Sequence, residues 1–247
     1  MHWWDYTTGV PELMQSLNQL VLQGKILYLG VSDTPAWIVA KANEYARNHG
    51  LRQFSVYQGR WSGAARDFER DIIPMTREDG MGLVPFGVLG SGAFKTEEQR
   101  KAATSGRKMT ATEDQIRISR ELETIARSKG GSPDLITSVA LAYVLHKAPY
   151  VFPVVGLRKV EHLKQNIQAL TLRLTNEDIE RIERAVPFDL GFPHDLLWNA
   201  AENGGRVPDN PADVWLSRMS GNMDYVQIPK AIAPPVRPKS SSSKGEQ

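Results

Sequence analysis

Hydrophobic and polar positions follow two alternating periods along the chain, which indicates strands separated by helices. A short apolar run at 26–31 is followed by apolar residues at helical spacing, among them Ile38, Ala42 and Ala46. A second short apolar run, 54–57, comes next and ends at Gln58. Short continuous apolar runs bounded by turn residues are typical of strands buried on both faces. This stretch therefore predicts a strand, a helix and a second strand.

The same unit repeats along the chain. Two of the later helices begin with the pattern of a capping box, in which Thr112 precedes Gln115 and Thr175 precedes Asp178. Alternating strands and helices indicate an α/β fold with a parallel sheet. The further strands are expected at 82–86 and 151–155, and the other apolar helical stripes lie within 10–21, 112–129, 132–144, 160–170 and 175–186.

Polar side chains stand where the first two strands end. Ser32 and Asp33 follow the first strand, and Gln58 closes the second. Ligands of parallel β/α folds bind at the carboxyl ends of the strands, so these three residues are candidates for a binding site. Ser32, Asp33 or Thr34 can equally cap the next helix. Gln58 has no helix to cap, so the functional interpretation is stronger there.

Composition and charge exclude several classes of protein. The chain has 247 residues, of which 41% are hydrophobic and 23% charged, enough to bury a core. It contains no run of about 18 apolar residues, so no membrane span is expected. The net charge of +2 is too small to indicate nucleic-acid binding, and the five histidines show no metal-ligand spacing. Zero cysteines exclude thiolate chemistry and fit a cytoplasmic protein.

The chain divides into three parts. Residues 1–190 carry all the periodic segments and form one expected globular domain. Residues 191–228 have weak periodicity and are expected to form a C-terminal loop region. Residues 229–247 are rich in proline and serine, a composition typical of a disordered tail.

Five motifs occur in order at the ends of expected elements, and together they resemble the aldo-keto reductases. Within that family the chain is similar to the fungal aryl-alcohol dehydrogenase and norsolorinic-acid-reductase-like group. Each motif alone is weak, whereas five collinear ones are specific. The motifs are HWWD at 2–5, GVSDTP at 30–35, YQGRWS at 57–62, GVLGSG at 87–92 and VVGLRKVEHLKQN at 154–166.

The resemblance implies a TIM-type (β/α)8 barrel, of which residues 1–190 are the second half, strands four to eight. His2 and Trp3 then correspond to the end of strand four. The first three strands of the barrel are absent, and with them the family's catalytic tyrosine, aspartate and lysine. An open half-barrel would expose a strand edge and an apolar face, so self-association is expected.

The resemblance also implies roles in the handling of a carbonyl substrate. His2 would donate a hydrogen bond to the carbonyl oxygen, and Trp3 and Trp61 would line an aromatic pocket. Other interpretations stay open, because His2 is close to the N-terminus and both indoles can serve ordinary packing at the barrel rim.

The cofactor implied by the resemblance is NADP(H), held along its length by residues at the strand ends. The family's usual asparagine is replaced by Asp33, whose carboxylate can only accept hydrogen bonds. Arg158 would bind the adenosine 2′-phosphate, since a cation at a helix start calls for an anion. Phe86 could instead serve core packing, and residues 87–92 could be a flexible loop without a role in binding. From nicotinamide to adenine the implied contacts are Ser32, Asp33, Gln58, Phe86, Gly87, Leu89, Gly90, Ser91, Gly156, Arg158, Gln165 and Asn166.

The function expected from the resemblance is NADP(H)-dependent interconversion of an aldehyde or ketone and its alcohol. The substrate would be a small aryl or polyketide carbonyl compound. The alternatives are a non-catalytic NADP-binding or regulatory module and a truncated gene product.

Overall fold

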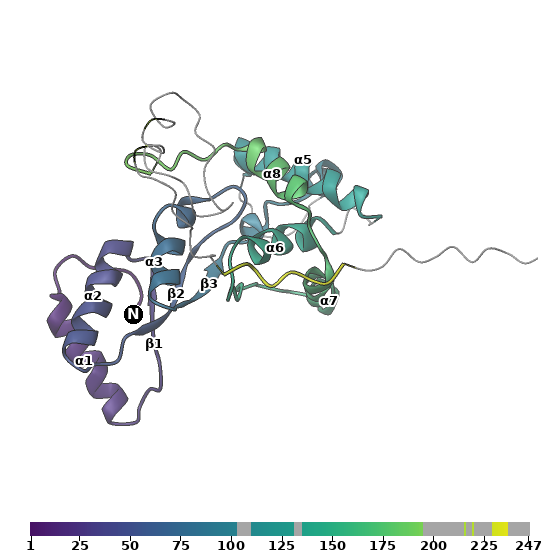
Figure 1. Cartoon of the computed structure of the whole chain (residues 1–247). Coiled ribbons are helices and arrows are strands. Elements are labelled where there is room, and N and C mark those ends of the chain that lie inside the picture. The colour runs from purple at the N-terminus through teal and green to yellow at the C-terminus, as the bar shows by residue number, and fades with distance from the viewer. Residues whose placement is uncertain (103–109, 131–134, 195–214, 216–218, 220–228, 237–247) are drawn as a thin grey trace, which may run out of the picture.

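A parallel sheet runs through the computed structural model, which describes residues 1–102, 110–130, 135–194, 215, 219 and 229–236. Three strands, β1 (Leu29–Ser32), β2 (Phe54–Arg60) and β3 (Gly82–Phe86), pair in that order. Both pairings are parallel, which confirms the expected α/β class. Figure 1 shows the strands in the middle of the molecule, with helices on either side.

A short segment extends the sheet on each side. His2 forms a parallel bridge with Ser32, and Val151 forms one with Leu83. The Trp3 amide donates to the Ser32 carbonyl at 2.9 Å. On the other side the Val154 amide donates to the carbonyl of Pro85 at 2.8 Å. Five consecutive parallel segments thus lie in the predicted order, as in part of a barrel.

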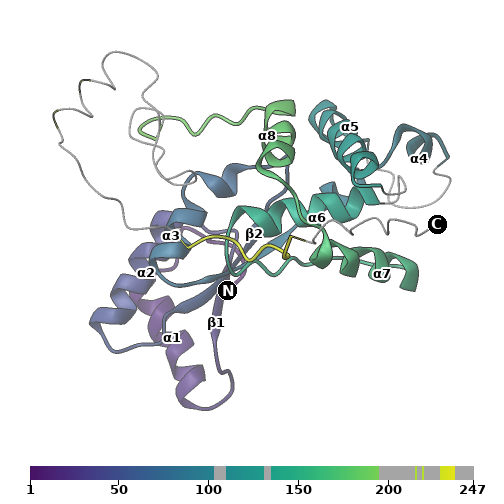
Figure 2. The same cartoon turned by 45° about the vertical axis from the view of Figure 1, so that its right-hand side comes forward.

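The helices form two groups. α1, α2 and α3 lie at the end of the molecule occupied by β1, whereas α5, α6 and α7 lie at the end occupied by β3 (Figure 1, Figure 2). α5 contacts both α6 and α8, and α6 contacts α7. The helices are α1 (Val10–Leu22), α2 (Ala36–Asn48), α3 (Ile72–Glu78), α4 (Glu97–Ala102), α5 (Glu113–Ser128), α6 (Ile136–Lys147), α7 (Val160–Gln168) and α8 (Asn176–Ala185), with short 3₁₀ turns η1 (Asp67–Glu69), η2 (Gly90–Gly92) and η4 (Ala169–Thr171).

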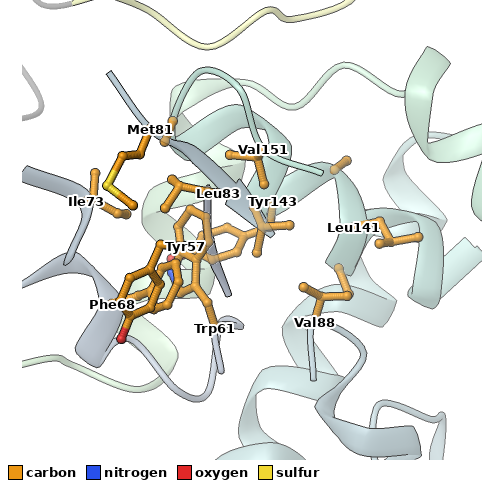
Figure 3. Close-up of a cluster of buried hydrophobic side chains, with 14 of the residues drawn as sticks. Tyr57, Trp61, Phe68, Ile73, Met81, Leu83, Val88, Leu141, Tyr143 and Val151 are labelled. Carbon is orange, nitrogen blue, oxygen red and sulfur yellow. The ribbon is translucent and has the colours of Figure 1, made fainter. Parts of the chain in front are cut away.

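One hydrophobic core joins the sheet to both groups of helices. Figure 3 shows Tyr57, Trp61 and Phe68 packed together within it. The Trp61 and Phe68 rings are stacked with centroids 5.6 Å apart, and Tyr57 meets Phe68 edge-on at 5.4 Å. Aromatic pairs of this geometry stabilise a core beyond the area that they bury.

Helix starts agree with the sequence in two places and differ in one. The capping boxes of α5 and α8 are present, and each side chain bonds the expected backbone amide. The prediction of a side-chain cap on α2 is wrong. Its N-cap is Pro35, and no side-chain cap bond is made there. Thr34 precedes the N-cap, and its hydroxyl donates to the Ser32 carbonyl.

Three strand boundaries differ from the predicted ones. β1 begins at Leu29, and the preceding Leu27 and Tyr28 are exposed, so the apolar run 26–31 is a buried strand only at its end. β2 continues past Gln58 to Arg60, because pairing with β3 holds it extended. In the expected strand 151–155 only the bridge at Val151 is formed, together with single bonds to β3. The start of the helix expected at 132–133 lies outside the described residues, and α6 is seen from Ile136.

The apolar stripe of α7 faces solvent. Three side chains of α7 and that of Leu170 in the following turn η4 are between 45% and 63% exposed. Phe152 and Val154 in the preceding extended segment are 60% and 46% exposed. This surface, the α7 face, consists of Phe152, Val154, Val160, Leu163, Ile167 and Leu170. A helix normally buries such a stripe, so the exposure of the α7 face differs from the expectation of an inward-facing helix stripe.

The C-terminal parts are described only in pieces. Most of the expected loop region 191–228 and residues 237–247 of the expected tail lie outside the described residues. Residues 229–236 form no helix or strand, and the Arg173 guanidinium donates to the Pro234 carbonyl. None of the helices formed by the described residues has the length and apolar character that crossing a bilayer requires.

Candidate functional site

The parallel sheet brings three of the predicted site residues, His2, Ser32 and Gln58, into one row. Ser32 pairs with Gln58, and Gln58 pairs with Val84. His2 lies beside Ser32 on the other side. Since parallel partners share a face, these side chains form a row across the carboxyl half of the sheet. Gln58 belongs to this row although it lies within β2 rather than at its end.

His2, Ser32 and Asp33 are grouped at one corner of this row. The Ser32 hydroxyl donates to Asp33 Oδ2 at 3.0 Å, and His2 Nε2 lies 3.9 Å from the same oxygen. Ser32 is buried, whereas the His2 and Asp33 side chains are 69% and 35% exposed. Asp33 is in the left-handed region at φ 48°. The arrangement leaves an imidazole and a carboxylate open to a ligand, with the serine behind them.

The two tryptophans have different positions. Trp3 is exposed, and its ring stacks on His2 with centroids 4.9 Å apart. Trp61 is fully buried, and its indole donates to Glu69 Oε1 at 3.1 Å. An exposed indole next to the histidine suits a pocket wall, while the contacts of Trp61 are those of core packing.

The glycine-rich loop after β3 turns sharply. Phe86 ends the strand half-buried, and Gly87 and Gly90 follow with φ of 69° and 60°. A Cβ on Gly90 would lie 2.9 Å from the Phe94 ring, so only glycine fits. Ser91 is exposed with φ 55°, and Leu89 is half-buried. The Gly90 and Gly92 amides donate within the turn, to the Gly87 and Leu89 carbonyls at 2.8 and 3.1 Å, and glycine at such positions lets a ligand approach the backbone closely.

Exposed cations precede α7. Lys159 is its N-cap, and Arg158 and Gly156 lie just before it, all three exposed. Within the described part of the chain, neither Arg158 nor Lys159 takes part in an ion pair. Positive charge is unfavourable beside the positive end of a helix dipole unless an anion is bound there.

Asn166 contains a buried donor that the fold does not satisfy. Its Nδ2 atom is inaccessible and has no hydrogen-bond partner among the described residues. The carbonyl of its neighbour Gln165 accepts from the Ser138 hydroxyl at 2.7 Å, which fixes the backbone there. An unsatisfied buried amide costs about 1–3 kcal/mol, so each such group in a native structure requires a cause.

These features fit a dinucleotide phosphate better than a metal ion. Across the described ranges no three His, Asp or Glu side chains gather as metal ligands. The left-handed loop, the exposed cations before α7 and the Asn166 donor would instead suit phosphate groups and a base. All of them follow carboxyl ends of neighbouring parallel segments, where ligands of this fold class bind.

One residue of this region was not selected from the sequence. Tyr57 was assigned only to a strand, yet its hydroxyl bonds the backbone of Thr34, next to Asp33. Sequence reasoning could have noticed only that an aromatic residue with a polar tip precedes Gln58.

Comparisons with known proteins agree on one family. The sequence profile of the Aldo/keto reductase family matches residues 1–187. Norsolorinic acid reductase B of Dothistroma septosporum is 55% identical over 240 residues, covering 95% of this chain and 60% of the relative. Norsolorinic acid reductase B of Aspergillus parasiticus is 49% identical over 245 residues, with 95% and 63% covered.

An aryl-alcohol dehydrogenase of Pestalotiopsis microspora is also similar. It is 54% identical over 237 residues, which cover 95% of this chain and 59% of the relative. The chain therefore spans about three fifths of the length of these curated relatives.

Proposed function

Because the chain belongs to the aldo/keto reductase family, we propose that it is an NADP(H)-dependent oxidoreductase that interconverts an aldehyde or ketone and its alcohol. The names of its relatives favour aromatic and polyketide-type carbonyl compounds as substrates. The observation that carries the proposal is the row of His2, Ser32 and Gln58 at the carboxyl edge, in line with the anion-binding features after β3 and before α7.

Each end of the cofactor has suitable side chains. Ser32, Asp33 and Gln58 would hold the nicotinamide carboxamide, with the Asp33 carboxylate accepting from the amide nitrogen. Phe86 offers a ring at the strand end beside them, and the loop Gly87–Ser91 would surround the pyrophosphate. When bound, NADPH supplies the hydride that reduces a carbonyl carbon.

The adenosine end would lie near α7. Arg158 can fork onto the 2′-phosphate, with Gly156 leaving room for its approach. Gln165 and Asn166 would lie near the adenine, and the inaccessible Asn166 Nδ2 would gain a partner only after its side chain turns outward.

The substrate would be oriented by His2. A neutral imidazole donates one directional hydrogen bond, here to the carbonyl oxygen. Trp3 stacks on His2 and would cover an aromatic substrate from one side. Trp61, being buried, would contribute by supporting the rim rather than by direct contact.

Cofactor titration of the 247-residue protein tests this proposal. We expect Arg158→Ala to weaken NADPH binding about ten- to a hundredfold, because a charge-assisted bond is worth roughly 1.5–3 kcal/mol. NADH lacks the 2′-phosphate, so its affinity should hardly change. Lys164→Ala removes the same charge from a later turn of α7 and is the control. Equal losses for both cofactors would refute the 2′-phosphate assignment.

Turnover separates this function from the second candidate, a cofactor-binding module without catalysis. Oxidation of NADPH by the purified protein with aromatic aldehydes supports the reductase. Tight NADPH binding without turnover supports the module. Failure to bind either cofactor would refute both.

A further inference from the structure

The turn that follows β1 is held by a side chain from the neighbouring strand. The Tyr57 hydroxyl accepts a hydrogen bond from the Thr34 amide at 3.2 Å. The same hydroxyl donates to the Thr34 carbonyl at 2.7 Å. One buried phenol thus satisfies both backbone groups of a residue adjacent to the candidate site, and Tyr57 is only 2% exposed.

This turn needs such support because its backbone is strained. Asp33 has a φ of 48°, where a residue with a Cβ costs about 1–3 kcal/mol. α2 does not supply the support, since its N-cap is Pro35 and no side-chain cap bond is made there. Other bonds of the turn include those from the Asp33 amide to the Gln58 carbonyl at 3.1 Å and from the Thr34 hydroxyl to the Ser32 carbonyl at 3.0 Å.

Tyr57 is itself rigidly placed. Its ring meets Phe68 edge-on in the cluster of Figure 3. Its strand neighbours in register, Val31 and Leu83, are also buried, so Tyr57 lies on the helix-covered face of the sheet. Gln58 points to the opposite face. The hydroxyl therefore reaches the turn from behind, without entering the space in front of Ser32 and Gln58.

The phenol is also a dependable donor. Burial, with the nearby Asp33 charge, raises the pKa of Tyr57 to about 12, although its bond to Thr34 works in the opposite direction. At neutral pH the hydroxyl keeps its proton and can make both bonds.

We infer that Tyr57 is a positioning residue for the nicotinamide end of the site, because its hydroxyl fixes the turn that presents Ser32 and Asp33 to the ligand. This inference rests on the proposed function. A turn set before binding spares the ligand the cost of ordering it, so loss of the hydroxyl should be felt by ligands that reach the turn.

The test compares two ligands on Tyr57→Phe, which keeps the ring and its contact with Phe68. NADPH spans the whole site, whereas adenosine 2′,5′-bisphosphate carries only the adenosine end. We expect about five- to thirtyfold weaker NADPH binding, as loss of one or two buried bonds implies, and unchanged binding of the bisphosphate. Tyr45→Phe is the control, because that hydroxyl bonds only Gln15 among the described residues, away from the turn.

Hydrogen exchange on the free protein gives a second measurement. The Thr34 amide should exchange faster in Tyr57→Phe, while amides in the middle of β2 stay protected. Equal affinity of both proteins for NADPH, an equal loss for both ligands, or an unchanged Thr34 amide would overturn the inference. Wild-type protein that binds neither ligand would instead refute the proposed function, and the inference with it.

Discussion

A buried ionic cluster gives the sharpest test of how the fold is held together. Glu69 is at its centre, with a side chain 4% exposed. Its carboxylate accepts from Arg66 at 2.7 Å and from the Trp61 indole at 3.1 Å. The ammonium of Lys147, 5% exposed, is 3.5 Å from Glu69 and 2.7 Å from Glu183. The cluster joins η1, α6 and α8, and consists of Trp61, Arg66, Glu69, Tyr143, Lys147 and Glu183.

Glu69→Gln removes one charge and almost no volume. Arg66 and Lys147 would then lose the charge of Glu69 and keep their pairs with Glu183, at 3.4 and 2.7 Å. Breaking a buried charge pair costs about 3–5 kcal/mol. For a chain of this size that corresponds to roughly 6–20 °C in Tm. The matched control is Glu44→Gln, whose exposed pair with Arg47 should contribute less than about 1 kcal/mol.

The pH dependence supplies a second readout in urea unfolding. Burial tends to raise the pKa of Glu69, but the bond from Arg66 and the charge of Lys147 outweigh it and lower the pKa from 4.5. A carboxyl group with a depressed folded pKa contributes its full stability above the unfolded value and loses it as the pH falls through the folded one. The difference between wild type and Glu69→Gln should therefore be largest near neutral pH and shrink below about pH 4.5. If Glu69→Gln lowers the free energy of unfolding no more than Glu44→Gln does, or by an amount that is constant with pH, this reasoning is refuted.

Two further predictions concern acid sensitivity and association. Burial lowers the pKa of His146 below 6.5, although the bond of its Nδ1 to the Ala142 carbonyl at 2.7 Å works in the opposite direction, and the neutral ring accepts from the Leu174 amide through Nε2. The stability of the wild type should therefore fall as the pH drops below about 6.5. In His146→Gln the urea midpoint should change less with pH in that range than it does in the wild type, and an equal change in both proteins would contradict this. The exposed α7 face predicts that the protein self-associates. Leu163→Glu or Ile167→Glu should then lower the molecular mass measured by sedimentation. A wild-type protein that is already monomeric would contradict this prediction.

The periodic segments were predictable because their signals are local. The apolar stripe of α5 and the capping box at Thr112 are both present, since each depends on residues within a few turns of one helix. The order of the parallel segments was also predictable, because consecutive βα units pair with their neighbours. His2, Ser32 and Gln58 were brought together for the same reason.

Features that depend on distant partners were not predictable. In the sequence, Ser32 and Asp33 were equally explained as helix caps. In the structure the turn is instead bonded to Tyr57 from another strand. The stripe of α7 read as a buried helix face, yet whether a stripe is covered depends on what lies opposite it. Likewise Glu69 and Lys147 are far apart in the sequence, and no local pattern marks them as a pair.

The two faces of β2 explain why neighbouring residues of one motif have different roles. Tyr57, Gly59 and Trp61 share a face, and a Cβ on Gly59 would lie 2.7 Å from the Phe68 ring. That face packs against Phe68 and, through the Trp61 indole, against the ionic cluster. Gln58 points the other way, in register with Ser32. Because the side-chain period of a strand is two, Gln58 and its neighbour Tyr57 face opposite sides of β2, and Trp61, just past the strand, is buried with Phe68. The motif YQGRWS therefore combines the proposed binding residue Gln58 with residues that pack its strand and hold the adjacent turn in place.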